Sequence, residues 1–167
     1  EDTLSLHDAL PISIVLSALI GSISFAGSMV AFAKLQELIG GRPITYAGQQ
    51  FVNGALFFTA LGCSIALVFG AQAEWLLWVT VLASLAFGVL FVLPIGGADM
   101  PVVISLLNAF TGLSAAAMGV ALNNDALIVA GMIVGASGTI LTNQMAVAMN
   151  RTIPAIVAGG FGGGGAA

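Results

Sequence analysis

Apolar residues in this chain gather into long runs, which short segments rich in glycine, proline and polar residues separate. A helix needs about 20 residues to cross a bilayer, and the runs reach that length. They do not alternate between apolar and polar positions, as the strands of a membrane barrel would. We therefore predict an all-α fold, a polytopic bundle of about five transmembrane helices at about residues 12–33, 50–70, 75–94, 101–122 and 125–149.

The segments between the runs carry residues that end or begin helices. Residues 40–43, Gly-Gly-Arg-Pro, follow the first run and forbid its continuation. Asp99 is placed to cap the fourth helix, with Pro101 in its first turn. Asn124 or Asp125 is placed to cap the fifth.

Composition supports the membrane assignment. Of the 167 residues, 59% are hydrophobic and 6% are charged, whereas a soluble domain carries roughly 25% charged residues. Three basic residues cannot form a nucleic-acid surface. Cys63 is the one cysteine, which excludes an intrachain disulfide and a Cys/His metal site.

The basic residues predict the orientation of the bundle. Lys34 and Arg42 lie between the first two helices, and Arg151 follows the fifth. With five spans all three fall on one side, which the positive-inside rule makes cytoplasmic, together with the C-terminus. Trp75 and Trp78 open the third helix, where aromatic anchors are expected at the opposite interface.

Asp99, Ser105 and Asn108 are the candidate functional residues of the chain. An acid at the mouth of an apolar helix, with an amide about two turns further in, is typical of a route for protons or ions. Two simpler interpretations stay open: Asp99 can be only a helix cap, and Asn108 can form only an interhelical hydrogen bond.

Three helices carry faces of small and polar residues, which favour close helix packing. These faces are Ser17, Gly21, Ser24, Ser28 and Ala31 in the first helix; Ser105, Asn108, Gly112, Ala115 and Gly119 in the fourth; and Gly131, Gly135, Gly138 and Thr142 in the fifth. We infer that these three helices meet at a central contact, while the second and third face lipid more. Packing alone is the simpler interpretation of the glycines.

The two ends differ from the rest of the chain. Residues 1–13 resemble a translated adapter string, so we predict a non-native segment, which includes His7. Residues 14–151 are the predicted transmembrane domain, and 152–167 a flexible Gly-rich hinge, whose first part at 153–158 is strand-like. Gly160, Gly162 and Gly165 fit the pattern GxGxxG, but only two residues follow, so we expect no cofactor site there.

Several segments resemble the beta subunit of the proton-translocating nicotinamide nucleotide transhydrogenases, over roughly residues 14 to 162. They agree in order and spacing, and are Gly27–Leu35, Ile95–Asn108, Asn124–Gly138, Met149–Arg151 and Ile156–Gly162. The resemblance implies the last five membrane helices of that subunit. It further implies that soluble domains, absent here, pass hydride from NADH to NADP⁺ and that the membrane part conducts the coupled proton.

The resemblance also implies roles for single residues. The family's loop aspartate and channel asparagine correspond to Asp99 and Asn108, with Ser105 nearby. The glycine-rich last helix corresponds to Gly131, Gly135, Ser137 and Gly138, and leads through Arg151 into the linker of the NADP(H) domain. The family's relay histidine has no counterpart, because His7 does not match it.

These implications lead to expectations for the whole assembly. We expect no catalytic, cofactor or metal residue in this chain, and an inactive fragment when it is alone. NAD(H) and NADP(H) would bind in the parent complex. Its partners would be an alpha subunit, further beta-subunit helices and a second copy of the complex in the bacterial inner membrane. The alternative is a structural or carrier-type membrane subunit without redox function.

Overall fold

The computed structural model of the chain describes residues 2–69 and 74–160. Its long helices are α1 (Asp2–Leu35), α2 (Gln49–Val68), α3 (Glu74–Val92), α4 (Met100–Ala121) and α5 (Asp125–Ala148). A 3-10 turn, η1 (Gly97–Asp99), precedes α4, and the short helix α6 (Ile153–Gly160) follows α5. Five of the helices are long and apolar enough to cross a membrane. The predicted all-α, multi-pass fold is confirmed.

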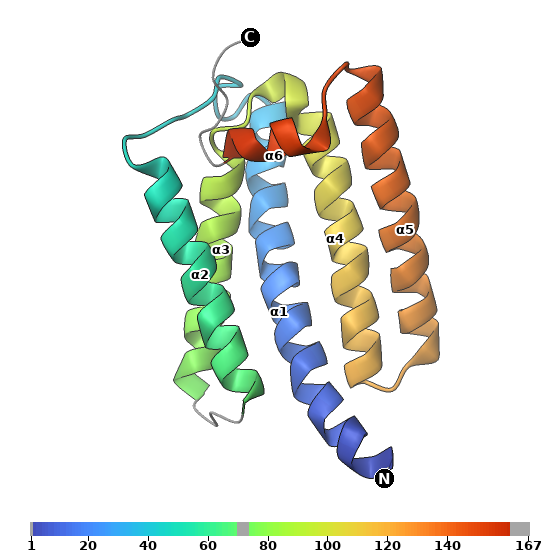
Figure 1. Cartoon of the computed structure of the whole chain (residues 1–167). Coiled ribbons are helices and arrows are strands. Elements are labelled where there is room, and N and C mark those ends of the chain that lie inside the picture. The colour runs from blue at the N-terminus through green and yellow to red at the C-terminus, as the bar shows by residue number, and fades with distance from the viewer. Residues whose placement is uncertain (1, 70–73, 161–167) are drawn as a thin grey trace.

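The five long helices alternate in direction through the bundle (Figure 1). The α1–α2 segment, the α3–α4 loop and the α5–α6 connection therefore lie at one end, which we call the α6 end. Asn124 caps α5 at the opposite end, where its side-chain oxygen accepts a hydrogen bond from the Leu127 amide at 3.1 Å. Pro101 lies in the first turn of α4, as its fixed φ angle predicts.

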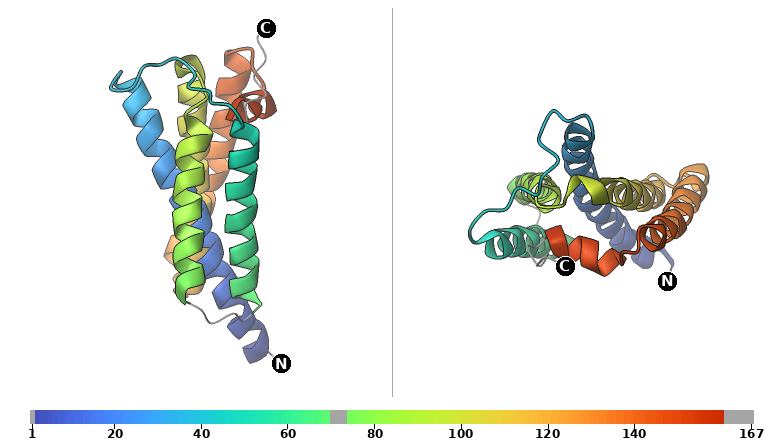
Figure 2. Two further views of the ribbon diagram at one scale, coloured as in Figure 1. Left: turned by 90° about the vertical axis from the view of Figure 1, so that its left-hand side faces the viewer. Right: turned by 90° about the horizontal axis from the view of Figure 1, so that it is seen from above.

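The order of helix contacts differs from our expectation. α4 packs against α5 on one side and α1 on the other, while α1 also packs against α3, and α3 against α2. Seen from above, α5 lies at one edge of the bundle (Figure 2). The inferred central contact of the first, fourth and fifth helices is therefore wrong. Gly88 explains the position of α3, because a Cβ there would lie 2.5 Å from the Ile23 carbonyl oxygen of α1.

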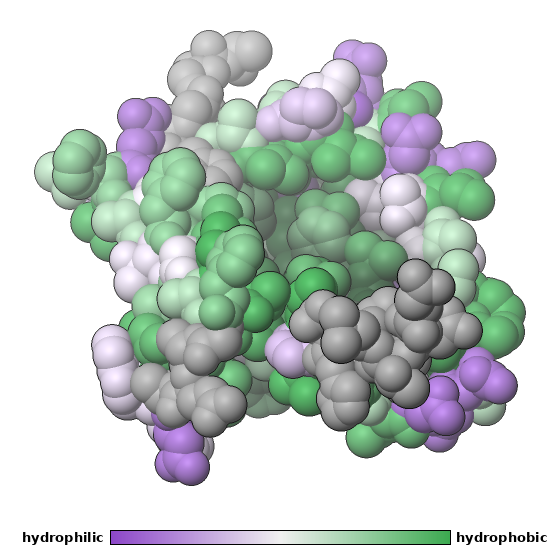
Figure 3. Space-filling view, turned by 60° about the horizontal axis from the view of Figure 1, so that its bottom comes forward, coloured by the Kyte–Doolittle hydropathy of each residue, from purple (hydrophilic) through white to green (hydrophobic). Residues whose placement is uncertain are grey.

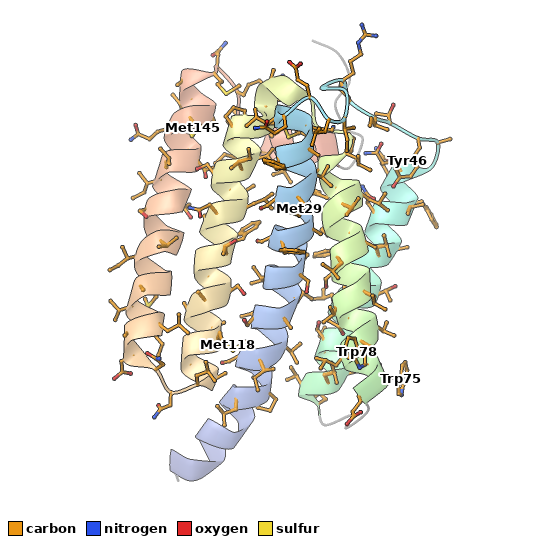
Figure 4. All side chains as sticks on the ribbon, turned by 180° about the vertical axis from the view of Figure 1, so that it is seen from behind. Met29, Tyr46, Trp75, Trp78, Met118 and Met145 are labelled. Carbon is orange, nitrogen blue, oxygen red and sulfur yellow. The ribbon has the colours of Figure 1, made fainter. Side chains whose placement is uncertain are left out.

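The best-packed part of the core lies toward the α6 end. It includes the fully buried side chains of Val92, Met100, Val102, Val103 and Leu107. Outside this core, the molecular surface is largely apolar. An apolar hollow opens in it between α1, α2, α3 and α4 (Figure 3). Trp75 and Trp78 lie exposed near the start of α3, and Tyr46 lies at the other end of the molecule (Figure 4).

The segment that follows α5 forms a helix in its first part. Ile153–Gly160 is α6, which lies across the end of the bundle (Figures 1 and 2). The Thr152 hydroxyl accepts a hydrogen bond from the Ala155 amide at 3.4 Å, and Ile156 is buried in the core. Our expectation of a strand-like stretch at 153–158 is thus wrong, because these residues are helical. The hinge role of 152–167 stays a prediction, and residues 161–167 lie outside the described residues.

Candidate functional site

Asp99 and Arg151 form an ion pair at the α6 end. Arg151 Nη2 lies 3.0 Å from Asp99 Oδ2, and the Asp99 side chain is more deeply buried than that of Arg151. Asp99 occupies the position before α4, but its side chain makes no capping hydrogen bond. The interpretation of Asp99 as only a helix cap is therefore wrong. The carboxylate joins the start of α4 to the segment that leads into α6.

Local backbone structure brings Arg151 to this position. Asn150 adopts a left-handed conformation with φ 54°, which ends α5, and the Arg151 amide donates to the Ala146 carbonyl at 2.9 Å. No local sequence pattern predicts this pairing, because the two residues are 52 positions apart. The sequence indicates only that both residues lie on the same side of the membrane, and that few other charges are available to pair with either.

A partly polar pocket opens beside this ion pair. It lies between the segment before α2, the α3–α4 loop and α6, and its lining includes Pro43, Gly96, Asp99, Arg151, Ile156 and Gly159. Both charged side chains line the pocket, together with residues of the segment before α2, the α3–α4 loop and α6. A movement of α6 would therefore change the surroundings of Asp99 directly.

Ser105 faces α5 from the second turn of α4. Its hydroxyl oxygen lies 3.0 Å from that of Thr142, which also lies 2.7 Å from the Gly138 carbonyl oxygen. Each hydroxyl carries one hydrogen, so Ser105 donates to Thr142 when Thr142 donates to Gly138. Both residues are buried. This polar contact links two membrane helices. Ser105 is buried, whereas Asn108 is exposed.

The predicted glycine face of α5 lies against α4. A Cβ on Gly131 would meet the Ala116 amide nitrogen at 2.4 Å, and one on Gly138 would meet Ala109 Cα at 3.0 Å. Gly135 is also buried and approaches Leu113 and Ala109. Ser137 points away from this contact, being exposed, and its hydroxyl donates to the Val134 carbonyl at 3.3 Å.

Asn108 lies on an exposed strip of α4. Phe110, which lines the apolar hollow, follows it by two residues, or about 200° around a helix. Asn108 is therefore on roughly the opposite side of α4 from the hollow. No hydrogen bond joins the Asn108 side-chain amide to another group among the described residues. An amide at this depth needs a partner or water, so this strip is the place where further polar groups would be expected.

The described residues contain no group of three or more His, Cys, Asp or Glu side chains that could hold a metal ion. The charged chemistry of the described site is thus the Asp99–Arg151 pair, together with Lys34. From its position in the sequence, Lys34 is expected only to help orient the bundle, but its side chain is buried beneath the α3–α4 loop.

Comparison with known proteins agrees with this architecture. The model of the family described as NAD(P) transhydrogenase beta subunit matches residues 2–167. The chain belongs to the NAD(P) transhydrogenase beta subunit family. The match includes most of residues 1–13, whose non-native origin stays a prediction.

Two curated members of the family show how much of it this chain represents. Both are named NAD(P) transhydrogenase subunit beta and come from Rhodospirillum rubrum, one of them from a defined strain. Each is 41% identical over 158 residues, which cover 95% of this chain and 34% of the relative. The chain therefore spans about a third of these subunits, and its five apolar helices represent a membrane part of the family.

Proposed function

We propose that this chain is the proton-conducting membrane part of a nicotinamide nucleotide transhydrogenase. In this proposal soluble domains outside the chain bind NAD(H) and NADP(H) and transfer hydride from NADH to NADP⁺. The chain itself binds neither nucleotide and is inactive when alone. The observation that carries the proposal is the Asp99–Arg151 ion pair, because it joins a membrane helix to the segment that leads out of the membrane domain.

Coupling between nucleotide and proton would pass through this pair. Arg151 belongs to the connection between α5 and α6, and Asp99 immediately precedes α4. A change in the NADP(H) domain that moved α6 would shift Arg151. The positive guanidinium would then no longer lie 3.0 Å from the Asp99 carboxylate, and the electrostatic surroundings of Asp99 would change. By reciprocity, a change of charge in the membrane part would alter NADP(H) affinity by the same factor.

The proton path in this proposal follows the exposed strip of α4 that holds Asn108. Because α5 does not share a contact region with α1, a path between α1, α4 and α5 is not available within this chain. Further membrane helices from outside the chain would cover the strip and enclose water beside the Asn108 amide. Ser105 and Thr142 would then keep α5 fixed beside the path.

The placement in the cell follows from the same residues. Lys34, Arg42 and Arg151 all lie toward the α6 end, which the positive-inside rule assigns to the cytoplasm. We propose a bacterial inner membrane location with the C-terminal side cytoplasmic. The partners would be the remaining beta-subunit helices, the NADP(H) domain and an alpha subunit with the NAD(H) domain, in a complex that forms a homodimer.

Two substitutions in the intact, full-length enzyme test the proposal. Asp99→Ala removes the partner of Arg151 and should change the rate of NADP(H) release by about tenfold, within the usual range of coupling between sites. Asn108→Leu should impair proton pumping into vesicles while NADP(H) affinity stays close to that of the wild type.

The outcomes separate coupling from simple packing. Unchanged nucleotide release in Asp99→Ala would overturn the coupling role of the ion pair. Normal, coupled pumping in Asn108→Leu would remove Asn108 from the proton path. Thr139→Ala serves as a matched control, because Thr139 is exposed on α5 and its hydroxyl bonds only within its own helix.

A further inference from the structure

Lys34 is the buried cation of this chain. It lies in the last turn of α1, and its side chain is 2% exposed. Its Nζ donates hydrogen bonds to the carbonyls of Val92 at 3.5 Å, Leu93, and Ile95 at 2.9 Å. Among the described residues no carboxylate lies within ion-pair distance of it. The three donors of the ammonium thus face the carbonyl oxygen of Val92, the last residue of α3, and two carbonyl oxygens of the α3–α4 loop.

A buried ammonium needs such an arrangement. Removing a charge from water is costly unless polar groups replace the lost hydration. The carbonyls at the C-terminus of a helix form the negative end of its dipole, and the Val92 carbonyl, which also accepts from the Ile95 amide at 3.1 Å, lies there. Lys34 supplies donors to these carbonyls, and the carbonyls supply the negative potential that Lys34 requires. The carbonyls therefore stabilise the buried ammonium, and the ammonium supplies hydrogen bonds to the buried carbonyls.

The contact also fixes the chain that leads to Asp99. Ile95 lies four residues before Asp99, and between them the Gly97 amide donates to the Gly41 carbonyl at 2.8 Å. At the start of the loop the Leu93 carbonyl also accepts from the Ile44 amide at 3.2 Å. The α3–α4 loop is therefore held at its start by Lys34 and the segment before α2, and at its end by Arg151.

We infer that Lys34 is a positioning residue for Asp99: its ammonium sets where α3 ends and so places the Asp99 carboxylate against Arg151. The inference rests on the proposed function, because it gives Lys34 an effect on nucleotide release that passes through Asp99. A purely structural role for Lys34 makes a different prediction, since it would alter the protein whether or not the Asp99 carboxylate is present.

A double-mutant cycle in the full-length enzyme distinguishes the two roles. Lys34→Met removes the charge and the donors while keeping an unbranched side chain of similar length. We expect it to change the rate of NADP(H) release in the same direction as Asp99→Ala, by about tenfold. In the double variant Lys34→Met/Asp99→Ala the rate should equal that of Asp99→Ala alone, because residues that act through one contact are not additive.

Controls address folding and charge. Arg42→Met removes an exposed positive charge from the neighbouring segment and should leave NADP(H) release within about twofold of the wild type. Lys34→Gln keeps amide donors for the carbonyls, so it should assemble even where Lys34→Met does not, and the same cycle can be run with it. Its effect on release should be smaller than that of Lys34→Met.

Four results would overturn the inference. Additive effects of the Lys34 and Asp99 substitutions would show that Lys34 acts independently of Asp99. Normal release in Lys34→Met, with altered release in Asp99→Ala, would remove Lys34 while leaving the proposed function intact. Loss of assembly in both Lys34 variants would show a folding role. Normal release in Asp99→Ala would instead reject the coupling role of Asp99 itself, and this inference with it.

Discussion

Gly131→Ala is the sharpest test of how α4 and α5 pack. An alanine Cβ at this position would lie 2.4 Å from the Ala116 nitrogen and 2.6 Å from the Gly112 carbonyl oxygen. Both are backbone atoms, so no side chain can rotate away. Ordinary contact begins near 3.4 Å, so the helices must separate by about 1 Å to relieve the 2.4 Å approach.

The expected cost follows from that separation. A radial gap of about 0.5–1 Å forfeits a quarter to a half of the dispersion energy at each contact, and overpacking typically costs about 1–3 kcal/mol. Alanine regains about 1 kcal/mol of helix propensity. Since the clash involves backbone on both helices, the upper part of the overpacking range applies. We expect a net loss of about 2 kcal/mol.

The measurement is thermal unfolding of the purified chain in detergent, followed by circular dichroism. A loss of about 2 kcal/mol corresponds to a midpoint lower by roughly 4–8 °C in a chain of this size. Gly62→Ala is the matched control, because a Cβ on Gly62 in α2 meets nothing within 4 Å. It should match or slightly exceed the stability of the wild type. If Gly131→Ala were as stable as Gly62→Ala, the close α4–α5 contact described here would be refuted.

Two further predictions use the same unfolding assay. Thr142→Val should lower stability by about 1 kcal/mol, because it removes the hydroxyl that pairs with Ser105; Thr139→Val, whose hydroxyl bonds only to Gly135 of its own helix, should cost less, and an equal cost would argue against an interhelical role. Asn53→Leu should cost about 1–3 kcal/mol, since its buried amide donates to the Leu90 carbonyl and accepts from Tyr46. Tyr46→Phe removes only one of those bonds, and a cost as large as that of Asn53→Leu would contradict the assigned contribution of the Leu90 bond.

The elements of the fold that depend on local sequence could be predicted. Runs of apolar residues mark membrane helices because the bilayer thickness sets their length. Asn124 could be named as a candidate cap because its short side chain reaches the amides of the first turn. The glycine face of α5 also follows from spacing, since residues three and four apart share one side of a helix.

The choice of neighbouring helices could not be derived in the same way. A face of small residues shows that a helix can be approached closely, but not which helix approaches it. The third helix, α3, also carries a small and polar face, formed by Thr80, Ser84 and Gly88, and all three residues are buried. Giving this face too little weight led to the wrong expectation that α3 faces lipid. The contribution of α6 to the core could not be predicted, because Ile156 is buried by residues from several helices that meet at the α6 end.

The site could be predicted only as far as its individual residues. Asp99, Asn108 and Arg151 stand out because polar groups are rare in this chain. Their arrangement is set by contacts between distant segments, such as the pairing of Asp99 with Arg151 across 52 positions. Lys34 was read only as an orientation charge, since its sequence neighbourhood at the end of an apolar helix is equally typical of a lysine that reaches the interface.

Two of the three basic residues have a second role besides orienting the bundle, which affects how their substitution should be interpreted. All three predict the orientation of the bundle, yet Lys34 and Arg151 also hold the start and the end of the α3–α4 loop. Neutralising either one weakens the orientation signal and releases the loop that carries Asp99. Arg42 is exposed and forms no ion pair among the described residues, so Arg42→Met changes the orientation signal alone. A loss of function shared by all three neutral variants would therefore indicate inverted insertion, whereas a loss confined to Lys34 and Arg151 would indicate the loop.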